Sequence, residues 1–279
     1  MFKNRKLLIA TKHKKESVIA PILEKELGVI CFTDDHFDTD QYGTFSGEIE
    51  RINDPITTLK NKCLSAMEQN NCDLAVSSEG SFGPHPTLFF ANADDEFLIF
   101  IDKKNNIEII VRELSTSTNF SGKEINSKNE LMDFAQKIGF PSHGLILKKN
   151  SQSCGQKIEK GIVDFVKLND VYELLKTDNQ ALYVETDMRA MYNPTRMEVI
   201  KTATTKLVSK IMSCCPQCEI PGFDVTKANK GLACNLCGFP TNSILSYIYE
   251  CQHCNFTKTE MYPHNKQFED PMYCDNCNP

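Results

Sequence analysis

The sequence predicts a mixed α/β domain over residues 1–213, a mixed sheet with flanking helices, followed by a small cysteine-rich domain over residues 214–279. Three observations predict this organisation. Short apolar runs alternate with segments of helical periodicity through the first 212 residues, which is the pattern of an α/β fold. Nine of the 13 cysteines lie between Cys214 and Cys277. A length of 279 residues suits about two domains.

Each expected strand is a short apolar run that ends at charged or turn-forming residues. The turn Lys104-Asn105-Asn106 joins two of these runs into an expected hairpin. In chain order the expected strands are 6–11, 28–33, 73–78, 97–102, 107–114, 144–149 and 181–186.

Helices are expected where apolar residues recur every three or four positions. The last of them has Asn193 as its N-cap and Pro194 at its first position, both favoured there. Pro21 must either kink the first helix or lie in its first turn. The expected helices cover residues 14–27, 55–70, 127–138, 168–177 and 194–212.

Charge and hydropathy argue against several classes of protein. The chain has 31 Lys and Arg against 37 Asp and Glu, a net charge of −6, which disfavours a broad nucleic-acid-binding surface. No apolar run approaches the ~20 residues of a transmembrane helix. The basic start MFKNRKLLIATKHKKE lacks the apolar stretch of a signal peptide. We therefore expect a cytoplasmic protein that does not bind membranes.

The cysteines of the tail form four Cys-x-x-Cys pairs, the spacing by which one tight turn delivers two thiolates to a zinc ion. Taken in chain order, the pairs predict two structural four-cysteine zinc sites, each resembling a zinc ribbon. Disulfides or a redox dithiol are the alternatives, and Cys214 is left over. The expected ligands are Cys215, Cys218, Cys234 and Cys237 for the first site, and Cys251, Cys254, Cys274 and Cys277 for the second.

The composition of the tail disfavours nucleic acid as its partner. Residues 214–279 contain four lysines and no arginine against seven acidic residues, and each four-thiolate zinc site adds −2. Tyr247, Tyr249, Phe256 and Tyr262 are therefore expected to form a small core rather than to stack on bases. A structural cap or a protein-contact module is the favoured role, with an unknown partner.

A basic segment follows the first expected strand. Thr11 is succeeded by Lys12, His13, Lys14 and Lys15 at the start of the first expected helix. Cations at the positive end of a helix are unfavourable unless an anion binds there, and phosphate is the natural anion. The alternative is a solvated basic turn.

Carboxylates and an arginine mark further candidate sites. The acidic segment 34–40, followed by Glu48, suits a hard cation but is also typical of a surface loop. Glu79 lies beside Gly80 at the expected end of a strand, where open α/β sheets bind ligands, although an ordinary tight turn explains it equally. Arg196 lies in the first turn of the last helix, again suited to an anion.

The whole chain resembles an uncharacterised bacterial protein family with a C-terminal double zinc-ribbon tail. The motifs that carry this resemblance are ATKHKKE, DTDQYGTFSGEIER, SSEGSFGPHP, ETDMRAMYNPTRMEVI and CPQCEIPGF. Residues 6–212 are also similar to the inosine triphosphate pyrophosphatase/Maf superfamily. Its A-T-x-N-x-x-K phosphate loop compares with residues 10–16, its acidic-glycine motif with Glu79-Gly80, and its Ser-His-Arg with Pro194-Thr195-Arg196. Its Thr-Phe element and helical Lys-Ala compare with Thr44-Phe45 and Lys62-Cys63.

The second resemblance implies a metal-dependent nucleoside triphosphate pyrophosphatase-like hydrolase. Thr11, Lys12, His13, Lys14, Lys15 and Arg196 would then bind the phosphates, and Glu48 and Glu79 would hold Mg²⁺ or Mn²⁺ and activate water. This chain departs from the motifs: His13 replaces Asn, Glu16 replaces the loop's Lys, and the Ser-His before Arg196 is missing. The alternative is a noncatalytic scaffold or sensor that binds a small phosphorylated ligand.

Overall fold

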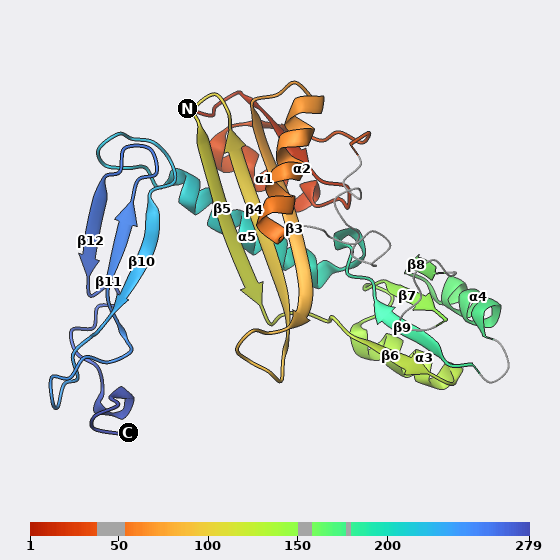
Figure 1. The fold of residues 1–279 in the computed structure, drawn as a ribbon. Helices are drawn as coiled ribbons and strands as arrows, with labels where there is room; N and C mark the ends of the chain where they lie inside the picture. The colour runs from red at the N-terminus through yellow and green to blue at the C-terminus, as the bar shows by residue number, and fades with distance from the viewer. Residues whose placement is uncertain (38–53, 150–157, 177–179) are drawn as a thin grey trace. The chain divides into compact units, whose positions relative to one another are not determined.

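The structure is a computed structural model that describes residues 1–37, 54–149, 158–176 and 180–279. The chain forms two compact units, Met1–Val208 and Ser209–Pro279, and each is described by itself (Figure 1). The mixed α/β fold predicted for the larger part is confirmed.

The larger unit is built on a five-stranded mixed sheet with strand order β2-β1-β3-β4-β5 (Figure 1). The strand β1 runs parallel to both of its neighbours, whereas β3, β4 and β5 form an antiparallel meander. The register pairs Ala10 with Ser77, so β3 continues well beyond the point where β1 ends. The strands are β1 (Lys6–Ala10), β2 (Ile30–Phe32), β3 (Leu74–Pro84), β4 (Asn92–Asp102) and β5 (Ile107–Ser115).

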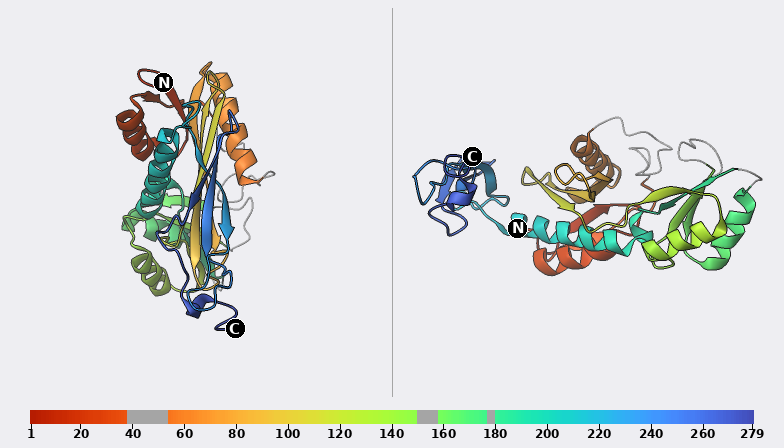
Figure 2. Two further views of the ribbon diagram at one scale, coloured as in Figure 1. Left: turned by 90° about the vertical axis from the view of Figure 1, so that its left-hand side faces the viewer. Right: turned by 90° about the horizontal axis from the view of Figure 1, so that it is seen from below.

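Helices cover both faces of this sheet (Figure 2). The helix α2 (Pro55–Gln69) begins at Asp54, whose side chain accepts hydrogen bonds from the backbone N–H groups of Ile56 and Thr57. Its buried side chains pack against Leu8, Ala75 and Ile99 on one face. The helices α1 (Glu16–Leu27) and α5 (Pro194–Met212) lie on the other face, and Pro21 lies inside α1.

The larger unit contains a second, antiparallel sheet of order β6-β9-β7-β8 that the sequence did not predict as separate. Two of its strands were missed because the segments GKEI and IEKGI are short and polar. The helices α3 (Lys128–Ile138) and α4 (Phe165–Leu175) share a core with this sheet. Its strands are β6 (Gly122–Ile125), β7 (Leu145–Lys148), β8 (Ile158–Ile162) and β9 (Leu182–Thr186), and the short helix η2 (Ala190–Tyr192) precedes α5.

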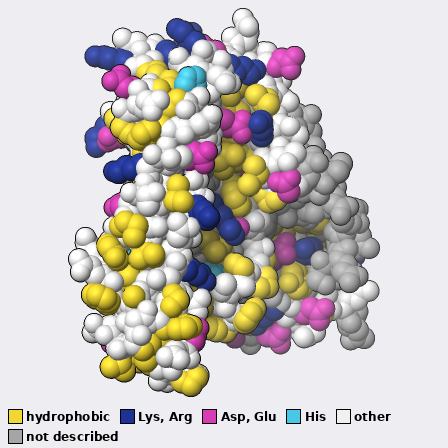
Figure 3. Space-filling view, turned by 60° about the vertical axis from the view of Figure 1, so that its left-hand side comes forward, with side chains coloured by type: hydrophobic (Ala, Val, Ile, Leu, Met, Phe, Trp, Pro, Cys, Tyr) yellow, Lys and Arg dark blue, Asp and Glu magenta, His cyan; other side chains and the backbone are white. Residues whose placement is uncertain are grey.

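The smaller unit is a three-stranded antiparallel sheet of order β10-β11-β12. Phe223 is its buried centre, with ring contacts to Tyr249 at 5.6 Å and to Phe256 at 5.9 Å. Tyr262 was expected in this core but is exposed. Figure 3 shows hydrophobic side chains toward the lower left of one face of the protein. The elements are β10 (Asp224–Lys230), β11 (Ile244–Glu250), β12 (Thr257–Met261) and the short helix η3 (Pro271–Tyr273).

Within the described residues, no helix combines the length and the apolar character needed to cross a membrane.

Candidate metal centres and charged site

The eight paired cysteines come together as two clusters, and within each cluster the sulfur atoms all lie within 4.8 Å of one another. The grouping in chain order is wrong, because each cluster takes alternate pairs. The first cluster is Cys215, Cys218, Cys251 and Cys254, and the second is Cys234, Cys237, Cys274 and Cys277.

The strands of the smaller unit explain the alternation. A single strand leads from each pair to the next, and the three strands run antiparallel. Successive pairs therefore fall at opposite ends of the sheet. The seven residues of β10 span about 23 Å at ~3.3 Å per residue, much farther than one metal ion can bridge. The first and third pairs must meet at one end, and the second and fourth at the other.

The spacing of the sulfur atoms suits a tetrahedral metal ion. The distance is 3.7 Å from Cys215 to Cys254 and 3.6 Å from Cys218 to Cys251, and the second cluster has 3.9 and 3.7 Å. Four thiolates at ~2.3 Å from a tetrahedral ion would lie about 3.8 Å apart, whereas a disulfide needs about 2.05 Å. The two clusters could therefore hold metal ions.

The local backbone supports thiolates in both clusters. The N–H of Gln217 donates to Sγ of Cys215, and the N–H of Leu236 donates to Sγ of Cys234, both at 3.4 Å. Gly238 adopts a φ of 73°, which glycine tolerates without strain. Its N–H donates to the carbonyl of Cys234 and so completes the turn between the two cysteines. Cys214 is exposed and belongs to neither cluster.

A second candidate site surrounds β3 where it passes the end of β1. The Nζ atom of Lys15 donates to Oγ of Ser78 at 3.0 Å. From α2, the Nζ atom of Lys62 donates to the carbonyl of Ser78 at 2.5 Å and to Oε2 of Glu79 at 2.7 Å. Both lysines are buried. Burial, followed by the charge of Arg196, lowers the pKa of Lys15 to about 8.

Arg196 and Glu96 form a buried ion pair on the face opposite Glu79. The Nε atom of Arg196 donates to Oε1 of Glu96 at 2.6 Å, and NH1 donates to the carbonyl of Met188 at 2.6 Å. Gly80 makes room for this pair, because a Cβ atom there would lie 2.4 Å from Oε1 of Glu96 and 2.5 Å from NH2 of Arg196. The anion expected at the start of α5 is thus supplied by the protein itself.

Asp94 is the least satisfied group of this site. It is fully buried two residues before Glu96, on the same face of β4, and no hydrogen bond reaches either carboxylate oxygen. Burial, followed by the charge of Glu96, raises the pKa of Asp94 to about 8. Neither carboxylate was predicted from the sequence, although Asp94 and Glu96 alternate with other residues just before the apolar run 97–102 and could have extended that strand.

The structure places Lys15, Lys62, Glu79 and Arg196 around the same stretch of β3. Lys15 and Lys62 both donate to Ser78, and Lys62 also donates to Glu79. Nζ of Lys15 lies 4.0 Å from Oε2 of Glu96, which is the partner of Arg196. Glu79 was expected at the end of a strand, with a tight turn as the alternative, but it lies inside β3, because β4 pairs with that strand as far as Pro84. Lys62 could have been predicted as a site residue from the sequence, because a lysine at a buried position of the apolar stripe of α2 needs a polar partner.

The other predicted phosphate ligands differ in their exposure. Thr11 is partly buried, and its hydroxyl has no hydrogen-bond partner. His13 is also partly buried, whereas Lys12 and Lys14 are exposed. Glu48 and residues 38–40 of the acidic segment lie outside the described residues.

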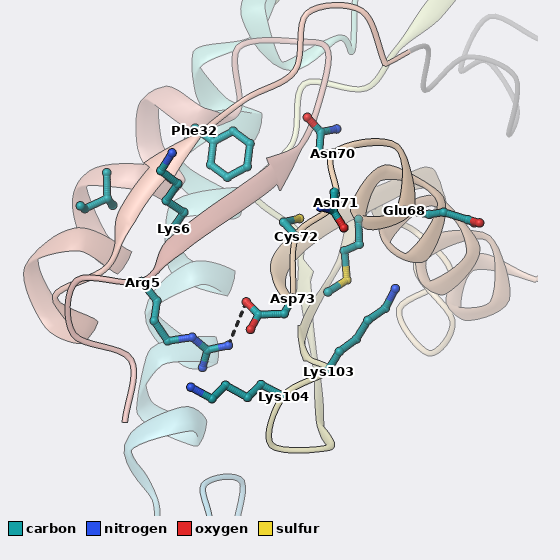
Figure 4. A pocket seen from close by; sticks show the side chains of 12 residues that line it. Arg5, Lys6, Phe32, Glu68, Asn70, Asn71, Cys72, Asp73, Lys103 and Lys104 are labelled. Carbon is teal, nitrogen blue, oxygen red and sulfur yellow. Dashed lines mark ion pairs between the residues drawn. The ribbon is translucent and has the colours of Figure 1, made fainter.

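A hollow lies at the opposite end of the five-stranded sheet (Figure 4). Its volume is about 1250 Å³, and it opens where β1 and β2 begin. Arg5 pairs there with Asp73 at 3.1 Å and with Asp102 at 2.6 Å. None of the predicted phosphate or carboxylate ligands that the structure describes lines this hollow, so it is separate from the charged site.

Comparison with known proteins identifies a family but no activity. A family model described as a domain of unknown function, DUF6671, matches residues 62–279, which is more than half of the chain. The match includes Lys62, Glu79, Arg196 and all eight clustered cysteines. No curated protein matches the chain.

Proposed function

The chain belongs to the DUF6671 family, and from the charged site of its larger unit we propose a metal-dependent phosphoanhydride hydrolase, of the nucleoside triphosphate pyrophosphatase kind. The comparisons lend no support to the resemblance to the inosine triphosphate pyrophosphatase/Maf superfamily, so the proposal depends on the geometry. We propose that the ions of the two cysteine clusters are zinc and that they are structural, because four thiolates favour zinc and leave no open position.

The observation that carries the proposal is the convergence of cations from separate helices on one segment of β3. Lys15 comes from the start of α1 and Lys62 from α2, and both donate to Ser78. Arg196 comes from the start of α5. Arg196 and Lys62 each have a carboxylate partner within hydrogen-bond distance, Glu96 and Glu79. The carboxylate paired with Lys15 is more distant, because Oε2 of Glu96 lies 4.0 Å from Nζ, and this leaves Lys15 as the cation best placed to bind an additional anion such as a phosphate.

Glu79 is the proposed carboxylate for water and metal. Its side chain is 17% exposed, and Oε2 accepts the hydrogen bond from Lys62, which fixes its orientation. Among the residues that the structure describes, only cysteines bring three ligand atoms together. This suits Mg²⁺ or Mn²⁺, because such ions take one or two carboxylates and complete their shell with water and substrate phosphates. Glu48 is the proposed second carboxylate.

The residues would divide the work of hydrolysis. Bound Mg²⁺ or Mn²⁺ would supply charge neutralisation and a more acidic water. Lys15 and Lys62 would hold the phosphate oxygens, and Glu79 would accept the proton of the attacking water as its oxygen bonds to phosphorus. The bridging P–O bond then breaks, and its electron pair leaves with the departing phosphate. Arg196 and Glu96 would keep α5 and β4 in position around this site.

The test is hydrolysis of standard and modified nucleoside triphosphates by the purified chain, with Mg²⁺ or Mn²⁺ and detection of pyrophosphate and phosphate. Glu79→Gln should abolish turnover while leaving the circular dichroism spectrum unchanged. Glu173→Gln, a matched change of a carboxylate that is 63% exposed on α4, should leave turnover unaltered. Absence of release across the panel with either ion would refute catalysis.

A noncatalytic binding module is the second candidate, and one observation favours it. Arg196 and Lys62 already form ion pairs with Glu96 and Glu79, so these four charges can stabilise the fold without taking part in catalysis. This candidate predicts that a nonhydrolysable nucleoside triphosphate binds without divalent ions, and that Lys15→Met weakens this binding. A metal requirement for binding would favour the hydrolase.

A further inference from the structure

We propose that the end of the smaller unit around the second cysteine cluster binds a positively charged, apolar segment of another protein. The surface concerned, called here the apolar end face, is defined by five exposed side chains. They are Leu236 (74% exposed), Phe239 (50%), Phe268 (53%), Met272 (61%) and Tyr273 (62%).

The apolar side chains near the two cysteine clusters differ in burial. At the first cluster, Phe223 is only 7% exposed and packs with Tyr249, Phe256 and the cysteines. The residues between the paired cysteines there include Gln217 and Gln252, which are polar. At the second cluster the corresponding turn carries Leu236, whose side chain faces solvent. At the second end Leu232 is also buried, but the five large apolar side chains of the apolar end face are exposed.

The apolar end face is held together by backbone contacts across two segments. The N–H of Asn235 donates to the carbonyl of Glu269 at 2.9 Å, and the N–H of Glu269 donates to the carbonyl of Ala233 at 2.8 Å. These bonds place the turn with Leu236 beside Phe268. The pair Met272 and Tyr273 directly precedes Cys274, whose sulfur lies 3.7 Å from that of Cys237. All five residues thus lie within six positions along the chain of a cysteine of the second cluster.

A group of large side chains this exposed indicates an interaction surface, because soluble proteins rarely leave such patches uncovered. Aromatic residues and methionine are also enriched where proteins contact one another. Tyr273, Phe239 and Met272 provide the residue types that anchor such contacts.

The charge around the apolar end face determines the kind of partner. Asp270 and Asp275 flank it, and neither forms an ion pair within the described part of the chain. The nearby Lys266 is already paired with Glu269. A divalent ion held by the four thiolates of the second cluster would leave that site with a charge of about −2. A segment with Lys or Arg beside apolar residues complements this field, whereas nucleic acid, anionic lipid and a second copy of this negatively charged unit are repelled.

The probe for this surface is a synthetic amphipathic 18-residue helix of Leu and Lys, labelled with a fluorophore, with a Leu/Glu peptide as its charge-reversed control. Anisotropy with the full, metal-loaded chain should show binding of the Leu/Lys peptide that weakens with salt. The double variant Leu236→Ser/Met272→Ser should lower the affinity at least tenfold while retaining two metal ions. The matched double variant Phe165→Ser/Val166→Ser, on exposed residues of the larger unit, should bind as the wild type does.

Several outcomes would overturn the proposal. They are no binding of the Leu/Lys peptide, equal binding of the Leu/Glu peptide, or equal loss of affinity in the two double variants. Self-association of the chain that Leu236→Ser/Met272→Ser abolishes would identify a second copy as the occupant. Stronger binding to phosphatidylserine vesicles than to neutral vesicles, lost in the same variant, would identify a lipid surface.

Discussion

Substitution of Gly80 by alanine should be among the most damaging single changes in the larger unit. The added Cβ atom would lie 2.4 Å from Oε1 and 2.8 Å from Cδ of Glu96, and 2.5 Å from NH2 of Arg196. Glu96 is fully buried and Arg196 is 5% exposed, so neither can move aside into solvent. The backbone of Gly80 needs no left-handed conformation, so the effect is steric.

The expected cost follows from the ion pair that would be separated. Separating a buried ion pair costs about 3–5 kcal/mol, and overpacking alone costs about 1–3 kcal/mol. We therefore expect Gly80→Ala to lower the free energy of unfolding by about 3–5 kcal/mol. Gly83→Ala is the matched control, because it lies in the same strand and nothing is within 4 Å of the added Cβ. It should change stability by less than about 1 kcal/mol.

Urea unfolding followed by far-ultraviolet circular dichroism can measure this difference, since the chain contains no tryptophan. The larger unit supplies the helical signal. If Gly80→Ala and Gly83→Ala unfold at the same urea concentration, the packing of the Arg196–Glu96 pair against β3 is not as described. A large loss for Gly83→Ala would refute the steric reasoning equally.

Three other predictions can be tested separately. Protein purified without added zinc should contain close to two equivalents, and Cys215→Ser/Cys251→Ser should retain one by elemental analysis, whereas sites formed in chain order would lose both. The smaller unit should show no salt-sensitive binding of single- or double-stranded nucleic acid at micromolar concentration in an anisotropy titration, because it has four lysines, no arginine and seven acidic residues from Cys214 onward. The pKa of Asp94 is raised to about 8 in the folded protein from about 4 in the unfolded chain, so the folded state binds this proton more tightly. The resulting contribution to the free energy of unfolding is complete below about pH 4 and is lost as the pH rises through about 8. Asp94→Asn should therefore gain stability relative to the wild type between pH 5 and pH 8, and a constant difference in urea midpoint would contradict this.

Local signals predicted the elements whose determinants are local. Pro194 begins α5, and the side chain of Asn193 accepts from the N–H of Arg196, as the helix-start pattern indicates. Asp54 was not predicted as the N-cap of α2, yet the periodic pattern predicted a helix over 55–70 and α2 covers Pro55–Gln69. The four Cys-x-x-Cys pairs predicted which eight cysteines cluster, because a two-residue gap is the spacing of one tight turn.

The features that the sequence could not predict depend on partners far along the chain. The local sequence around Glu79 and Gly80 is typical of a turn, and only pairing with β4 makes it part of a strand. The partner of Glu96 is Arg196, a hundred residues later in the chain. The grouping of cysteines likewise depends on the direction of three strands rather than on spacing. Lys62 gains its role only because β3 passes beneath α2. In each case a local pattern was compatible with two arrangements, and a distant contact selected one.

The alternate pairing of the cysteines also has a consequence for biosynthesis. A metal ion in each cluster would close a loop of the chain, and the loops from Cys215 to Cys254 and from Cys234 to Cys277 overlap. While the chain emerges from the ribosome, the first two pairs must wait unligated for the third before either cluster can be completed. Closing the first loop would then fix β11, which connects the second cysteine pair to the third. Metal uptake should thus follow a fixed order, and neither half of the tail should acquire its ion in isolation.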